Sequence, residues 1–334
     1  DQQGRASSSS SSYYIYAVGG RVRGRTIGTV ERFSVSKGIW ETCARIAEPR
    51  GSLAMAAVGT QVFAIGGSGI ASNLDSCECL ETSLSDDLKT PWQKCPTIGT
   101  ARHALAATES GGKIWVVGGW KYGDQSSGET ECLDLRKHFE TNASNTNSEG
   151  GAGRYFWRPC SSLNVARKLH GLTSLGGKLY VFGGMAANSF KPLSSAECYD
   201  PQSDKWGPIR DMPSGARCCA TRVGGAIYII LFGEAPEFGV LRYDVKADRY
   251  EKLARLPIEK WFGFSCAVVG DRYVHVLGGK SNGKWIGCHY CYDTQEDSWQ
   301  ELPGMLAHRR RLGVVAVATV VTSVSPPPPP PPPP

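Results

Sequence analysis

The sequence predicts an all-β fold, a six-bladed β-propeller whose first blade is closed by the C-terminal strand. The main observation is an apolar run that ends in a glycine pair and recurs along the chain, degenerate in one copy. The last glycines of these runs are 47, 52, 65, 49 and 46 residues apart, and a period near ~45–50 residues is typical of propellers and solenoids. They are Gly20, Gly67, Gly119, Gly184, Gly233 and Gly279.

Each apolar run is expected to be a strand buried on both faces. Residues 114–117 and 179–182 are continuously apolar and do not alternate with polar residues. Such a pattern is typical of a strand covered on both sides, as in a blade that packs between two neighbours. The paired glycines permit positive φ and close backbone approach, so we interpret them as structural.

Two further positions keep phase with the glycines in every copy. A lone aromatic residue follows a short acidic-aromatic strand, at Trp40, Trp92, Trp157, Trp206, Tyr250 and Trp299. A basic residue lies 10 or 11 positions beyond it, at Arg50, Arg102, Arg167, Arg217, Lys260 and Arg310. We name these six positions the basic column. Since they recur once per blade, we expect them to brace the sheets and not to contact a ligand.

The double glycine, the following Tyr-Asp strand and the spaced tryptophan together resemble the kelch repeat. The resemblance covers about residues 13–322. Copy five matches least well, because Phe232 replaces the first glycine and Tyr250 replaces the tryptophan. The WD repeat is the competing interpretation of the period, but its Trp-Asp dipeptide does not occur in the sequence.

The two ends of the predicted array complement each other. The chain enters a repeat at the strand over residues 13–18, and residues 310–317 form the strand that precedes a glycine-pair strand in every other copy. Joining them completes a sixth blade and leaves no exposed sheet edge. This closure is similar to that of the six-bladed kelch domains of BTB-kelch proteins.

Three segments are therefore expected, namely a Ser-rich linker over residues 1–12, the propeller over 13–322 and a polyproline tail over 323–334. The run Pro326 to Pro334 would form a polyproline II helix, which could dock SH3, WW or profilin-like partners or serve as a spacer. A polar insertion near residues 137–153 is expected to form a loop. Because the sequence begins with Asp1, we also expect an upstream domain to be missing.

Composition narrows the classes of function. No run reaches the ~18 apolar residues of a membrane helix, and the residues shown contain no signal peptide. The net charge is +6 without a long basic run, which does not favour nucleic acid. The twelve cysteines fit small buried thiols in a reducing compartment, so a cytoplasmic or nuclear location is expected. Those at equivalent repeat positions cannot pair with each other, because such positions lie far apart around a ring.

The chemical motifs in the sequence do not combine into an active site. Cys288 and Cys291 supply only half of a zinc site. Residues 278–284 match a phosphate-loop pattern, but Trp285 stands where Ser or Thr should hold magnesium. We expect no catalytic residues, no metal and no cofactor, and a propeller enzyme similar to the copper-radical oxidases is the least favoured alternative.

The kelch resemblance implies a partner-binding face made of two loops per blade, one after the glycine pair and one after the basic column. By position, the expected partner-binding residues are Arg21, Arg23, Ser52, His103, Trp120, Lys121, Tyr122, Lys168, Trp261, Lys280, Asn282 and Arg311. The same loops contain Ser68, Met185, Cys218 and one acid, Glu234. This set is rich in cations and aromatic rings, a composition that favours an acidic peptide.

We therefore expect a non-enzymatic protein-interaction domain that recognises an acidic segment of a partner. The resemblance implies the substrate-receptor part of a ubiquitin-ligase adaptor, joined to a cullin-type ligase through an upstream BTB or F-box domain. The alternative is an actin-binding, cytoskeletal or scaffold kelch protein that acts without ubiquitin.

Overall fold

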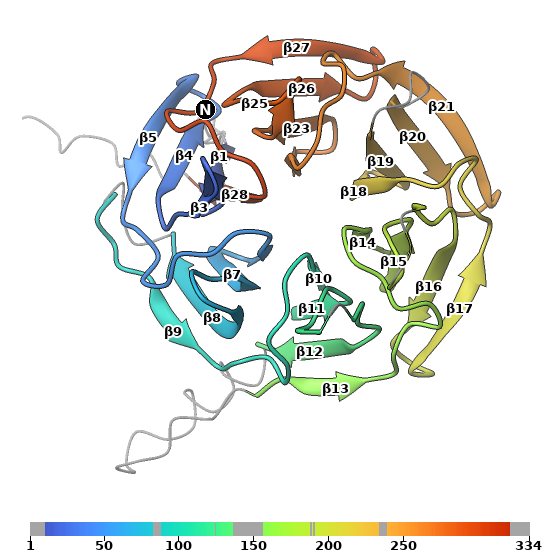
Figure 1. Ribbon diagram of the computed structural model, residues 1–334. Helices are drawn as coiled ribbons and strands as arrows, with labels where there is room; N and C mark the ends of the chain where they lie inside the picture. The colour runs from blue at the N-terminus through green and yellow to red at the C-terminus, as the bar shows by residue number, and fades with distance from the viewer. Residues whose placement is uncertain are drawn as a thin grey trace, which may run out of the picture.

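The computed structural model describes residues 11–82, 88–123, 125–135, 156–187, 189, 191–233 and 239–320. In this part of the chain, six four-stranded antiparallel sheets are arranged as blades around an axis (Figure 1). The predicted six-bladed β-propeller is confirmed. The insertion near residues 137–153, Glu234, the tail Pro326 to Pro334 and residues 1–10 of the expected linker lie outside the described residues.

Each blade runs from an innermost strand beside the axis to an outermost strand. Blade 1 is β28 (Gly313–Val320), β1 (Ser11–Val18), β4 (Val30–Ser34) and β5 (Ile39–Cys43); blade 2 is β6 (Ala54–Val58), β7 (Gln61–Ser68), β8 (Asn73–Glu81) and β9 (Gln93–Cys95); blade 3 is β10 (Ala106–Ser110), β11 (Lys113–Val117), β12 (Thr130–Asp134) and β13 (Arg158–Cys160).

The remaining blades repeat this order. Blade 4 is β14 (Gly171–Leu175), β15 (Lys178–Phe182), β16 (Ala196–Asp200) and β17 (Lys205–Ile209); blade 5 is β18 (Arg217–Val223), β19 (Ala226–Phe232), β20 (Gly239–Asp244) and β21 (Arg249–Arg255); blade 6 is β22 (Ser265–Val269), β23 (Tyr273–Leu277), β26 (His289–Asp293) and β27 (Ser298–Leu302). Two short hairpins project from the second strands of blades 1 and 6, namely β2 (Arg21–Val22) with β3 (Arg25–Thr26) and β24 (Lys280–Ser281) with β25 (Lys284–Trp285).

The ring is closed by the two ends of the described chain. Strand β28 pairs with β1 in an unbroken register from Ser11↔Val320 to Val18↔Gly313, and in Figure 1 it lies at the inner side of blade 1. The prediction that the C-terminal strand completes the first blade is confirmed. Strand β1 begins at Ser11, two residues before the expected start of the propeller.

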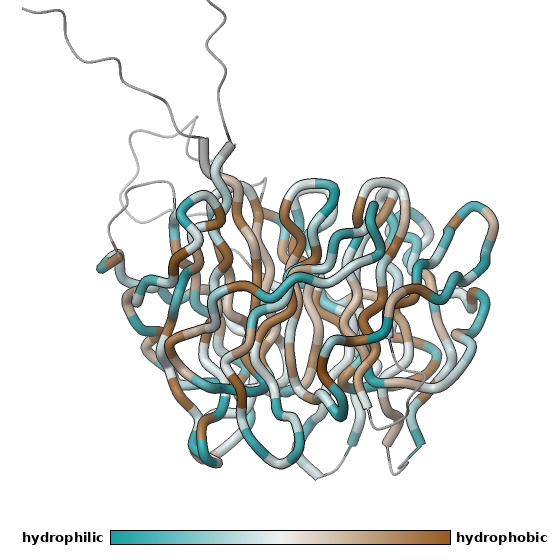
Figure 2. The backbone as a smooth tube through the Cα atoms, turned by 90° about the horizontal axis from the view of Figure 1, so that it is seen from above, coloured by the Kyte–Doolittle hydropathy of each residue, from teal (hydrophilic) through white to brown (hydrophobic). Residues whose placement is uncertain are grey.

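The core lies between the blades, and it explains the continuously apolar second strands. In β11, Ile114 and Val116 pack in one cluster with Phe63 of blade 2, whereas Val117 packs in another with Val181 of blade 4. Successive side chains of a strand point to opposite faces, and here each face meets a neighbouring blade. Figure 2 shows apolar residues along the strands and hydrophilic residues in the connections at the two ends.

The glycine pairs are required by close backbone approach. Gly66 and Gly67 have φ values of +57° and +107°. A Cβ on Gly67 would lie 3.0 Å from the carbonyl oxygen of Gly51, which few L residues tolerate at such a φ. Glycine is not required at position 232, because β19 remains extended through Phe232. This residue pairs with Arg217 of β18. The described residues contain no helix long and apolar enough to span a bilayer.

Candidate partner-binding face

The two predicted sets of loops lie at the same end of the ring. Antiparallel pairing brings the end of each second strand beside the segment that enters the innermost strand. Isolated backbone bridges join the two loops at Arg21↔Arg310, Gly51↔Ser68, His103↔Trp120, Lys168↔Met185 and Phe262↔Lys280. We name the surface formed by these paired loops the rim face.

A belt of backbone hydrogen bonds runs around the axis beneath the rim face. The amide of Ser52 donates to the carbonyl of Arg311 at 2.7 Å, and that of Ala104 donates to Ser52 at 2.8 Å. Leu169 and Cys218 continue the series. Ser52, Ala104 and Arg311 adopt positive φ values of 51°, 54° and 55°. The belt holds neighbouring blades in register where an axial cavity of about 170 Å³ begins.

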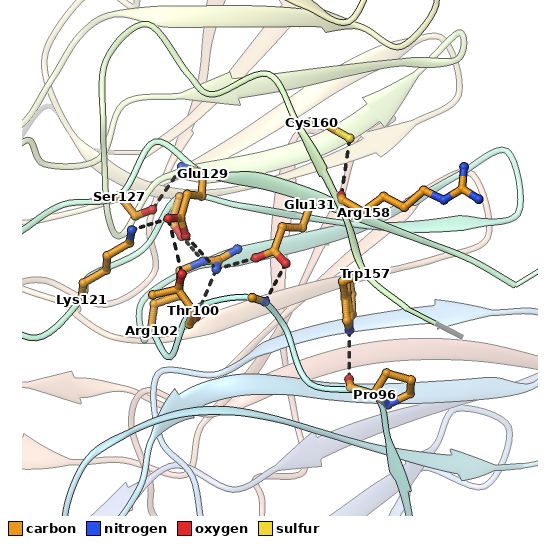
Figure 3. Close-up of polar contacts among 12 residues, drawn as sticks. Pro96, Thr100, Arg102, Lys121, Ser127, Glu129, Glu131, Trp157, Arg158 and Cys160 are labelled. Atoms are coloured by element: carbon orange, nitrogen blue, oxygen red, sulfur yellow. Dashed lines mark hydrogen bonds and ion pairs between the residues drawn. The ribbon is translucent and has the colours of Figure 1, made fainter. Parts of the chain in front are cut away.

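Four arginines are fully buried and paired with glutamates on the third strands. Three belong to the predicted basic column and the fourth, Arg309, lies one residue before its predicted member Arg310; we name these four the column arginines. Arg50, Arg102, Arg167 and Arg309 are each 0% exposed. The distances are 2.7 Å for Arg50–Glu78, Arg102–Glu131 and Arg167–Glu197, and Arg309 pairs with Glu31 in the same way. Figure 3 shows the Arg102–Glu131 pair. The prediction that the column braces the sheets is confirmed for Arg50, Arg102 and Arg167.

Three predicted members of the basic column are wrong by one residue. The amides of Gly184 and Gly279 donate to the carbonyls of Ala216 and Arg309, not to those of Arg217 and Arg310. In blade 6 the column residue is Trp261 and not Lys260, because the Trp261 Nε1–H donates to the carbonyl of Gly278 at 2.7 Å. This is the contact that Arg50 and Arg167 make with Gly66 and Gly183. A strict spacing of ten residues from Trp206 and Trp299 would have found Ala216 and Arg309.

Trp261 also belongs to the predicted partner-binding set. Trp261 is 0% exposed, so the prediction that it contacts a partner is wrong. Ser52 belongs to the belt and is also mostly buried. At the other extreme, the Tyr122 side chain is 95% exposed, while Arg23 and Asn282 lie exposed in the turns of the two short hairpins. Lys280 is half-buried at the base of its hairpin.

His103, Trp120 and Lys168, which are far apart in sequence, form one packed cluster. The His103 and Trp120 rings stack with centroids 5.7 Å apart, and the Lys168 Nζ lies 2.7 Å from the Trp120 ring centroid. Asn73 holds the cluster through its Oδ1, 2.8 Å from His103 Nδ1. Burial, together with the charges of Arg311, Lys168 and Arg21, lowers the pKa of His103 to about 4. The His103 imidazole is therefore neutral at pH 7.

The charge of Lys121 is compensated within blade 3. Its Nζ pairs with Glu129, whose second carboxylate oxygen lies 3.2 Å from Arg102 Nη1 (Figure 3). The repeat pattern does not indicate Glu129, because this residue lies at the end of the loop, next to the third strand. Lys121 is thus a poor candidate for an unneutralised cation on the rim face.

The remaining cations gather where blades 1 and 6 meet. Arg21, Arg310 and Arg311 are half-buried, and no carboxylate within the described ranges forms an ion pair with any of them. Arg21 Nε and Arg310 Nε are buried without a hydrogen-bond partner. Burial lowers the pKa of Arg311, and the charges of Arg310, Arg21 and Arg217 lower it further. We name Arg21, Arg310 and Arg311 the rim arginines.

All twelve cysteines are free thiols, five of them buried and seven partly buried. Equivalent thiols lie in different blades, as expected. Thiols at different repeat positions can share a blade, however. In blade 3 the Sγ atoms of Cys132 and Cys160 lie 3.7 Å apart. In the part of the chain that the structure describes, no three potential metal ligands gather at one point. Cys291 instead lies beside His275.

Comparisons with known proteins agree with this architecture. A family model for the kelch motif matches residues 4–45 and 166–213. Kelch-like protein 34 from Homo sapiens is 24% identical over 247 residues, covering 72% of this chain and 35% of that protein. Kelch-like protein 23 from Mus musculus is 26% identical over 246 residues, covering 70% and 39%.

A viral protein is also similar. Kelch repeat and BTB domain-containing protein 1 from Cowpox virus (strain Brighton Red) is 27% identical over 197 residues, covering 58% of this chain and 31% of that protein. The matches thus span well under half the length of these relatives. The chain thus forms a six-bladed β-propeller with two segments that match the kelch motif. Its propeller is similar to the kelch domain of Kelch-like proteins.

Proposed function

We propose that the rim face recognises an acidic segment of a partner protein and has no catalytic role. The observation that carries this proposal is the contrast in ionic partners. The column arginines have buried glutamates, whereas the rim arginines have no carboxylate among the described residues. Clustered guanidinium groups favour binding of an external anion, which would relieve their mutual repulsion.

Aromatic and apolar surface on the same face supports a peptide ligand. Tyr122 is highly exposed, and the Arg310 guanidinium lies 5.7 Å from the Trp285 ring centroid. Exposed ion pairs contribute only about 0–1 kcal/mol each, so such rings would supply contact area that charge alone does not. The experiment is affinity purification with the intact chain and with an Arg21→Ala/Arg310→Ala/Arg311→Ala variant.

We expect partners with acidic segments to bind the intact chain and to be lost from the variant. Equal recovery of the same partners on both baits would contradict the proposal. Since the variant keeps all four column arginines, it should fold normally, and its thermal unfolding serves as the control.

We further propose that this recognition selects substrates for a ubiquitin ligase, with a BTB domain supplying the contact to a cullin. Similarity to Kelch-like proteins and to a viral protein with a BTB domain in its name supports this setting. In cells, the full-length protein should promote ubiquitylation of its captured partner, and the rim variant should not. If the partner is bound but its ubiquitylation does not depend on the protein, a scaffold or cytoskeletal role replaces the ligase role.

A further inference from the structure

The rim arginines lie on adjacent backbone segments. The backbones of Arg21 and Arg310 are paired, since the Arg21 amide donates to Arg310 at 2.9 Å and the Arg310 amide donates to Arg21 at 3.2 Å. Residues paired across antiparallel segments have Cα atoms about 5 Å apart. The side chains of Arg21 and Arg310 therefore start from adjacent points on the rim face.

The third guanidinium approaches from the axis. Arg311 lines the axial cavity beside Ser52 and Gly263, and its positive φ of 55° turns the chain sharply between Arg310 and Arg311. A Cβ built on Gly263 would lie 3.6 Å from both Arg310 Cβ and Arg311 Cγ. The absence of a side chain at Gly263 therefore leaves space beside both arginines at the mouth of the cavity.

Among the residues that the structure describes, no neighbouring group forms an ion pair that would neutralise this cluster. The nearby Lys168 is a further cation, and its charge and those of Arg311 and Arg21 act together on neutral His103. The cavity below is lined largely by small and apolar residues, including Ala54, Ala106 and Leu312. An anion would therefore be held at the mouth, where the arginines are, and not inside the channel.

We propose that this cluster is a binding site for a phosphoserine or phosphothreonine within the recognised acidic segment. The proposal deepens the proposed function and depends on it. A phosphomonoester carries a charge of roughly −1.5 to −2 at pH 7 and three acceptor oxygens around one atom. Three clustered guanidinium groups can supply the matching charge and several donors, whereas a single carboxylate ligand offers one charge and two oxygens.

The test uses pools of short fluorescein-labelled peptides with acidic degenerate flanks and a central phosphoserine, serine or glutamate. Binding of each pool to the intact chain is measured by fluorescence anisotropy. We expect the phosphoserine pool to bind about tenfold more tightly than the glutamate pool, because charge-assisted hydrogen bonds are added. Arg311→Ala and Arg21→Ala should abolish the preference, and Arg311→Lys should weaken it because it removes the bidentate fork.

Matched controls remove a positive charge at the opposite end of the ring. Lys37 and Lys246 are exposed in the turns between third and fourth strands, so Lys37→Ala and Lys246→Ala should retain both affinity and preference. Thermal unfolding of every variant verifies folding.

Three other outcomes would overturn the phosphate site, the acidic recognition or both. Equal binding of the phosphoserine and glutamate pools, with both lost in the arginine variants, would overturn the phosphate site and leave acidic recognition standing. Binding of neither pool would overturn both. If a stoichiometric amount of inorganic phosphate displaces the phosphoserine pool completely, the site binds free phosphate, and the peptide assignment is overturned.

Discussion

The propeller places arginines in two contrasting environments. Arg50, Arg102, Arg167 and Arg309 are 0% exposed and paired with glutamates of their own blades. The rim arginines are half-buried and lack a carboxylate among the described residues. The same side chain therefore braces the sheet where the third strand supplies an acid, whereas at the rim face no described acid pairs with it.

In blades 5 and 6, both members of the buried arginine–glutamate pair are replaced together. Where blades 1 to 4 have arginine and glutamate, blade 5 has Ala216 with Val240, and blade 6 has Trp261 with Tyr290, whose rings meet at 5.8 Å between centroids. A buried ion pair can be replaced by apolar residues at little cost, whereas removing one partner is strongly destabilising. The sequence of the ring follows this rule.

The largest effect is expected from opening the ring. Deleting residues from Gly313 onward removes β28, exposes the edge of β1 and uncovers apolar residues such as Ile15 and Ala17, now 0% exposed. Ring closure also supports the column arginines, because Arg309, which directly precedes the closing strand, pairs with Glu31 of blade 1. We expect loss of cooperative unfolding, or aggregation, measured by circular dichroism and light scattering. A truncated chain that melts like the intact one would contradict the composite first blade.

Breaking one buried pair should have the next largest effect. Glu197→Ala leaves the Arg167 guanidinium buried without its carboxylate, which should cost about 3–5 kcal/mol of unfolding free energy. The matched control is Arg167→Ala/Glu197→Val, which reproduces the residues of blade 5. Denaturant unfolding should show that the double variant recovers most of the loss. Equal destabilisation of the single and double variants would disprove exchange as a unit.

Part of the acid sensitivity should come from two buried histidines of blade 6. His275 and His289 are buried, with 2.8 Å between Nδ1 and Nε2. Burial lowers the pKa of His275 to about 4, and burial with the His275 charge lowers that of His289 to about 3. In the unfolded chain the histidine pKa is about 6.5. Below that pH the unfolded state binds more protons, so stability falls as pH drops from about 6.5 towards 4.

The loss should be on the order of 1–2 kcal/mol per histidine at pH 5. Unfolding curves at pH 7.5 and pH 5 measure it in the intact chain and in a His275→Phe variant. The acid-induced loss should be smaller in the variant, whatever its stability at pH 7.5. An unchanged loss would show that other groups control the acid response.

The smallest effect is expected at Lys121. Its ion pair with Glu129 is partly exposed, and such pairs contribute about 0.2–1 kcal/mol. Lys121→Ala should therefore change stability by less than about 1 kcal/mol and leave peptide affinity nearly unchanged. A loss of affinity equal to that of Arg21→Ala would place Lys121 among the binding residues after all.

The repeat made most of the fold predictable from the sequence. Fixed phase between glycines, aromatic residues and basic residues predicted the blades, and the strand after Arg310 predicted closure. The site was less predictable. Trp261 is of a residue type common in binding sites, yet it takes the place that a buried arginine has in other blades. Only its hydrogen bond to Gly278 shows this. The ion pair of Lys121 and the clustering of His103, Trp120 and Lys168 depend on distances across loops, which repeat phase does not specify.

The most direct test of the account is to measure binding and stability together for Arg311→Glu. Affinity for the acidic peptide pools, or for the captured partner, is measured on the same preparation as denaturant unfolding. We expect the charge reversal to abolish binding and to change the unfolding free energy by no more than about 1 kcal/mol, because Arg311 has no ion-pair partner among the described residues to lose. Full binding by the folded variant would contradict the claim that the rim arginines bind an anionic partner.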